Sequence, residues 1–158
     1  MKCVAGSVSW LAFAFFIFVS PIETYAQKGQ AKATYQTFVA TAKSARSMKT
    51  LMRFLSAEEI SRYNQSMSWH TTSSAKTKAS KKKLARWKSI ANQYVSISKV
   101  AKNKKGYLLT LKTRSDAKFK TGGQQKKILH GVATVQMVNE KGAWKVGAYN
   151  DRGFVYQM

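Results

Sequence analysis

The amino-acid sequence predicts an α+β fold, with N-terminal helices packed on a curved antiparallel sheet of about four strands. Over the first half of the chain, apolar residues recur at helical spacing as far as Tyr94. After Tyr94, apolar and polar residues alternate, which is typical of strands with one covered face. Short polar segments at residues 103–106 and 139–142 interrupt this alternation and indicate hairpin turns. Helices followed by hairpins favour the α+β class.

Residues 1–26 are predicted to be a cleavable secretory signal that precedes a single domain at residues 27–158. Lys2 supplies a positive start, residues 10–19 form an unbroken apolar run, and Thr24 and Ala26 lie three and one positions before a cut. The alternative is an N-terminal membrane anchor, but the run is shorter than the roughly 20 residues that a spanning helix needs. We therefore expect an exported protein, periplasmic or extracellular.

Cys3 is the only cysteine of the chain, and it would be removed with the signal. The remaining domain would form no disulfide, even in a compartment that permits disulfides. Its stability must then come from an apolar core, and a chain of this length can bury enough surface to build one.

The chain is strongly basic, with a formal net charge of +22. Between Ile60 and Ser115 there are fourteen lysines and arginines and no acidic residue. Salt bridges within this stretch cannot neutralise it, so it must face water, counterions or an anionic partner.

Two helices are predicted before residue 68. The first carries a stripe of apolar positions and either continues through Ser47 or breaks there. Ser56 and Glu59 have the spacing of a capping box, so a second helix should span residues 57–67. Glu58 and Glu59 then stabilise a positive helix end, which we favour over paired catalytic carboxylates. The apolar positions are Tyr35, Phe38, Val39, Ala42, Ala45, Met48, Leu51, Met52 and Leu55 in the first stripe, and Ile60, Tyr63 and Met67 in the second.

Residues 68–80 are rich in Ser, Thr and Lys, lack periodicity and are predicted to be a loop. Ser80 can cap a third helix whose apolar stripe is Leu84, Trp87, Ala91 and Tyr94. Five basic residues project toward solvent around that stripe. They are Lys81, Lys82, Lys83, Arg86 and Lys88. Such a helix can bind an anionic membrane or nucleic acid, but the pattern more often belongs to a helix docked on its own sheet.

Two hairpins are predicted after Tyr94, separated by a polar loop at residues 118–127. Leu129, Gly131, Ala133, Val135 and Met137 share one face of the longest strand, and His130, Thr134 and Gln136 share the other. Trp144, Val146 and Ala148 share the inner face of the return strand. Residues 150–153 are expected to follow the last strand.

Residues 54–59, and above all the strand, turn and return strand at residues 131–146, resemble those of the nuclear transport factor 2-like (cystatin-like) superfamily. The segment Gly142-Ala143-Trp144-Lys145-Val146 matches the return strand typical of that superfamily. The resemblance implies a cone-like roll, a curved sheet wrapped around helices, often with a conical pocket. It implies no particular reaction, because this fold hosts both enzymes and binding domains.

His70, Asp116, His130 and Asp151 are the candidate catalytic residues. Only His130 lies on a confidently predicted strand, where it could bind a ligand or act as a general base. The alternative is a half-exposed structural histidine. Two histidines without cysteines or closely spaced carboxylates argue against a metal site, and no cofactor motif is present.

These observations leave three hypotheses for the function. We prefer a non-catalytic exported binding domain whose basic residues Lys81, Lys82, Lys83, Arg86 and Lys88 bind an anionic polymer, a membrane surface or an acidic protein. The second is a small-molecule enzyme or carrier that uses a conical pocket with His130. The third is an accessory subunit of a cell-envelope assembly. Asn64 begins a glycosylation sequon, to which we give little weight.

Overall fold

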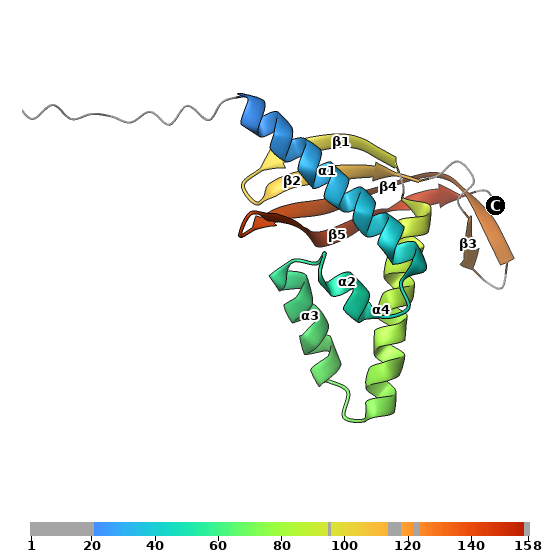
Figure 1. The fold of residues 1–158 in the computed structure, drawn as a ribbon. Coiled ribbons are helices and arrows are strands. Elements are labelled where there is room, and N and C mark those ends of the chain that lie inside the picture. Colours follow the sequence, from blue (N-terminus) through green and yellow to red (C-terminus); the bar gives the residue numbers. More distant parts are fainter. Residues whose placement is uncertain (1–20, 95, 114–117, 122–123, 157–158) are drawn as a thin grey trace, which may run out of the picture.

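The computed structural model describes residues 21–94, 96–113, 118–121 and 124–156. Within them, the helices lie on one side of a twisted antiparallel sheet (Figure 1), so the predicted α+β class is confirmed. The helices are α1 Pro21–Ser44, α2 Met48–Met52, α3 Ala57–Ser68 and α4 Ser73–Gln93. The strands are β1 Ser96–Asn103, β2 Gly106–Lys112, β3 Lys118–Thr121, β4 Gln124–Glu140 and β5 Ala143–Tyr156. None of the described helices has an apolar stretch long enough to cross a membrane.

The long strand β4 organises the sheet. It pairs with β2 and β3 along one edge and with β5 along the other, and β1 extends the sheet beyond β2. The two predicted hairpins are confirmed, because Asn103 pairs with Gly106 and Glu140 pairs with Ala143. The predicted loop at residues 118–127 is wrong. Part of this polar segment forms a further hairpin, in which β3 pairs with the start of β4 from Lys118↔Lys127 to Thr121↔Gln124.

The core lies between α1, α4 and the inner face of the sheet. The Phe38 ring of α1 meets the Trp87 ring of α4 edge to face at 5.3 Å, a favourable arrangement of aromatic rings. Leu109 and Val135 from the sheet are fully buried in the same cluster. Of the two alternatives for the first helix, the structure shows the break near Ser47, which has extended backbone between α1 and α2. The predicted docking of α4 on the sheet is also seen in its buried apolar stripe, which consists of Leu84, Trp87, Ile90, Ala91 and the adjacent Tyr94.

The N-terminus of α3 is anchored to the edge of β5. Ser56 Oγ accepts a hydrogen bond from the Glu59 amide, as a capping box requires. The reciprocal bond is not formed, because the Ser56 amide donates to the Val146 carbonyl at 2.9 Å. The Glu140 carboxylate accepts from the Ala57 amide at 3.0 Å instead. The start of α3 therefore has a fixed position relative to the β4–β5 hairpin.

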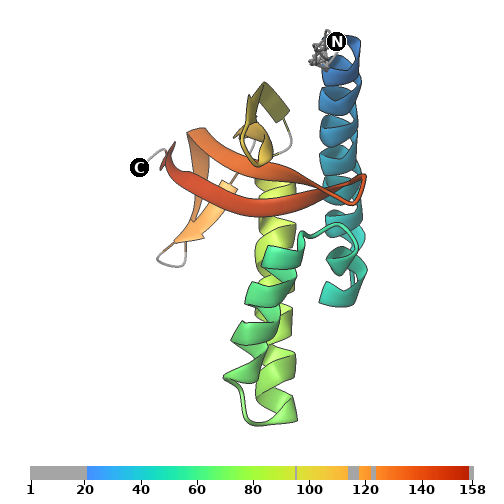
Figure 2. The same cartoon turned by 90° about the vertical axis from the view of Figure 1, so that its left-hand side faces the viewer.

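Beyond this anchor, α3 and the first half of α4 form a helical hairpin that projects past the sheet (Figure 2). The prediction that α3 buries its apolar residues is consequently wrong: Ile60 and Tyr63 are half-buried, and no α3 residue is fully buried. The predicted loop at residues 68–80 is too long: it covers only residues 69–72, because Thr72 caps α4 by accepting from the Ala75 amide. Ser80 does not cap this helix but lies inside it, hydrogen bonded to the Tyr63 hydroxyl at 2.9 Å.

A bulge in β5 changes which side chains face the helices. Val135 pairs with Tyr149 but Met137 pairs with Val146, so β5 contains one extra residue in this interval. Ala148 is therefore exposed, contrary to the prediction, and Tyr149 turns inward to lie 6.2 Å from the Trp87 ring. The prediction that residues 150–153 follow the last strand is wrong. They belong to β5, which continues to Tyr156.

Candidate anion-binding groove

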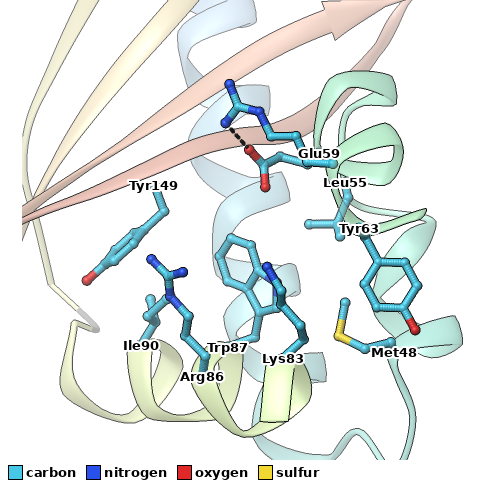
Figure 3. A pocket seen from close by; sticks show the side chains of 10 residues that line it. Met48, Leu55, Glu59, Tyr63, Lys83, Arg86, Trp87, Ile90 and Tyr149 are labelled. Atoms are coloured by element: carbon cyan, nitrogen blue, oxygen red, sulfur yellow. Dashed lines mark hydrogen bonds and ion pairs between the residues drawn. The ribbon is translucent and has the colours of Figure 1, made fainter. Parts of the chain in front are cut away.

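A cleft of about 170 Å³ lies where α3, α4 and β5 meet, and we call it the inner cleft. Figure 3 shows the side chains that surround it. Its apolar wall contains Trp87 and Ile90 from α4 and Tyr149 from β5, and its polar rim contains Glu59, Arg62, Lys83 and Arg86. Met48, Leu55 and Tyr63 complete the lining.

Helical spacing brings the α4 side chains to this cleft. Lys83, Trp87 and Ile90 are four and three residues apart, so they lie on the same side of α4, with Arg86 beside them. Docking of α4 through Trp87 and Ile90 thereby holds the two cations at the mouth of the cleft. Tyr149 reaches the cleft only because of the bulge in β5.

The cations at the rim differ in whether they form ion pairs. Arg62 forms ion pairs with Glu58 and, at 2.9 Å, with Glu59, so its charge is compensated within α3. Among the described residues, neither Lys83 nor Arg86 has an ion pair or a side-chain hydrogen bond. Glu58 and Glu59 therefore serve the helix end and Arg62, in agreement with the structural role predicted for them.

A second hollow of about 720 Å³ continues from the inner cleft along the helical hairpin, and we call it the outer groove. It adjoins the cleft because Lys83 and Arg86 line both. Lys78 and Lys82 add two exposed cations, and His70 closes the far end. Ser66, Ala75 and Ala79 supply the small side chains of its lining. Together, the inner cleft and the outer groove form what we call the basic groove.

The structure divides the five predicted anion-binding residues. Lys82, Lys83 and Arg86 line the basic groove. Lys81 lines a different hollow, together with Arg46 and Lys76, and Lys88 is not among the lining residues of the described hollows. The reason is the helical rotation of about 100° per residue, which places consecutive lysines on different sides of the docked stripe.

Of the candidate catalytic residues, only His70 lies in a described hollow. The backbone of His130 pairs with Val155, and that of Asp151 pairs with Ala133, but both side chains lie outside the described part of the structure, as does the whole of Asp116. No side-chain hydrogen bond or ion pair of His70 occurs among the described residues. In the same part of the chain, no three His, Cys, Asp or Glu side chains group as metal ligands would.

Lys78, Tyr149 and Arg62 are among the groove residues that were not predicted as binding residues. Lys78 lies in the segment assigned to a loop, and Tyr149 depends on a bulge that breaks the alternation of β5. Arg62 could have been found, because it follows Glu58 and Glu59 at the spacings that allow ion pairs on a helix.

The fold and the groove define a small α+β protein with a basic hollow between a helical hairpin and a sheet edge. A family model described as "Capsule polysaccharide biosynthesis protein" matches residues 15–142, which is most of the chain. The chain belongs to this family. The assignment to the nuclear transport factor 2-like superfamily is therefore wrong. The strand, turn and return strand at residues 131–146, on which it rested, satisfy the general requirements of a hairpin and are not specific to one family. No curated protein and no solved structure matches the chain significantly.

Proposed function

We propose that this protein is a non-catalytic accessory component of cell-envelope polysaccharide assembly and that it binds an acidic polysaccharide in the basic groove. Membership of the capsule polysaccharide biosynthesis family supports the envelope role. The chemistry of the groove supports the ligand class, because its cations exceed its acids and half-exposed aromatic surface lies at one end.

The arrangement of cations along α4 that have no ion pair among the described residues carries this proposal. Lys78, Lys82 and Arg86 follow one another at intervals of four residues, so they lie on one side of the helix. At a rise of 1.5 Å per residue, their Cα atoms span about 12 Å. A row of this length meets several negative charges of a polymer at once, whereas a single small anion would contact only part of it.

We expect the double variant Lys82→Glu/Arg86→Glu to bind an acidic polysaccharide about tenfold or more weakly than the wild type, which corresponds to about 1.4 kcal/mol or more. Alginate, with dextran as the neutral comparison, can be titrated by calorimetry across a salt series. The wild type should bind alginate only, with affinity that falls as salt rises, and the variant should show a weaker salt dependence.

The matched control is Lys104→Glu/Lys105→Glu, which makes the same change of charge on the exposed β1–β2 turn. It should retain alginate affinity to within about threefold, which is about 0.7 kcal/mol. Equal losses in both double variants would mean that only the net charge matters and would overturn the groove as the site. Binding to anionic vesicles but not to alginate would overturn the ligand class.

We also propose that the protein is exported and cut after Ala26, so that purified protein from an exporting host begins at Gln27. Thr24 and Ala26 carry the processing signal, within the part of α1 that precedes Gln27. The apolar run at residues 10–19 lies outside the described residues. N-terminal sequencing tests this expectation. A chain that starts at Met1 would contradict it, whereas Ala26→Tyr should block cleavage in a host that cleaves the wild type.

A further inference from the structure

The inner cleft contains side chains that are not needed to attract a polyanion. A row of exposed cations would suffice for such attraction, yet the cleft adds an aromatic wall from Trp87 and Tyr149 and a carboxylate from Glu59. Its volume of about 170 Å³ is below the roughly 300–1,000 Å³ of pockets for drug-sized ligands. The cleft is therefore large enough for one sugar-sized ring of a ligand but too small for several linked units.

The charge balance in the cleft limits the ligand further. The lining carries Arg62, Lys83 and Arg86 against Glu59, and Glu58 also pairs with Arg62. Counting both glutamates, the formal excess is one positive charge, which a single negative charge neutralises. The side chain of Glu59 is only 18% exposed, so a multiply charged phosphate close to it would be repelled.

Each group in the cleft then has a matching part on an acidic sugar. The planar guanidinium of Arg86 can donate two parallel hydrogen bonds to a carboxylate, and Lys83 adds a second positive charge beside it. Glu59 can accept hydrogen bonds from hydroxyl groups. The half-buried ring of Tyr149 can pack against the apolar C–H face of a sugar ring, and Trp87, only 8% exposed, supports it from behind at 6.2 Å.

We propose that the inner cleft is a subsite for one carboxylated sugar unit, with Arg86 and Lys83 binding the carboxylate and Glu59 accepting from the hydroxyls. The subsite deepens the proposed function and rests on it: the outer groove binds the polymer by charge, and the inner cleft selects carboxylated units over other anionic ones.

Arg86→Lys tests this subsite because it keeps the charge but removes the planar donor pair. The probes are trigalacturonate, its carboxyl-reduced neutral form and a sulfated trisaccharide, titrated by calorimetry into the full chain. The wild type should prefer trigalacturonate to the sulfated probe by at least fivefold and should not bind the neutral form. Arg86→Lys should abolish this preference, because the affinity for trigalacturonate falls to that for the sulfated probe. An unchanged melting temperature of the variant would show that its fold is retained.

Two further variants separate the parts of the groove. Glu59→Gln should strengthen binding of a phosphorylated trisaccharide relative to trigalacturonate, because the charge that repels the doubly charged phosphate group is removed. Lys78→Gln, in the outer groove, should weaken alginate binding and leave the preference among trisaccharides unchanged. If alginate binds in the groove but the wild type shows no preference for trigalacturonate, the subsite is overturned and the proposed function stands. If no acidic probe binds, both are overturned.

Discussion

Trp144→Ala should lower the free energy of unfolding by about 3–5 kcal/mol, the usual effect of emptying a buried aromatic site. Trp144 is buried, as predicted, with 8% of its surface exposed, and its ring lies 5.3 Å from the ring of Tyr107 on β2. The indole also borders the β1–β2 turn, since a Cβ added at Gly106 would lie 3.2 Å from it. Removal of the indole would therefore leave a cavity between two hairpins.

Urea denaturation followed by circular dichroism measures this effect. Trp69→Ala is the matched control, because Trp69 is 75% exposed and its truncation should change stability by less than about 0.5 kcal/mol. An unchanged midpoint for Trp144→Ala would place the side chain at the surface and contradict the register of β4 and β5.

Gly106→Ala is expected to destabilise the protein by about 3 kcal/mol or more, as backbone strain and a steric clash add together. Gly106 has a φ of +133°, which side-chain-bearing residues rarely adopt, and an added Cβ would lie 2.3 Å from the Met137 carbonyl oxygen. Gly106 pairs with Asn103, and Met137 pairs with Tyr107. Neither backbone segment can therefore move aside without loss of hydrogen bonds.

Gly142→Ala isolates the conformational part of this effect. Gly142 also has a positive φ, of +84°, but an added Cβ there would meet nothing within 4 Å. We expect a loss of about 1–2 kcal/mol from the left-handed conformation alone. The same urea titrations compare the two variants. Equal losses would show that the contact with Met137 contributes nothing and would contradict the close approach of β2 and β4.

Local chemistry was enough to predict most of the fold. The turns at residues 103–106 and 139–142 and the hydrogen bond from the Glu59 amide to Ser56 Oγ all depend on residues close in sequence. The first half of α4 was missed because it does not pack on the sheet and so has no apolar periodicity. The bulge that turns Tyr149 inward was missed because strict alternation assumes regular strand pairing. The pairing of β5 is irregular between Val146 and Tyr149.

The candidate site was predicted in part for the same reasons. Lys82, Lys83 and Arg86 were found because they flank a recognisable apolar stripe, but the sequence could not separate them from Lys81 and Lys88. That separation depends on which side of α4 faces α3 and β5. The inner cleft is a tertiary feature, formed by residues from α3, α4 and β5, and no local pattern indicates it.

Lysine acetylation followed by peptide mass spectrometry, with and without alginate, tests most directly whether the basic groove binds an acidic polysaccharide. We expect alginate to slow the modification of Lys78, Lys82 and Lys83 and to leave Lys104 and Lys105 unchanged, and we expect high salt to remove the protection. Equal protection of all exposed lysines, or protection confined to Lys76 and Lys81 in the hollow on the other side of α4, would contradict the basic groove as the binding site.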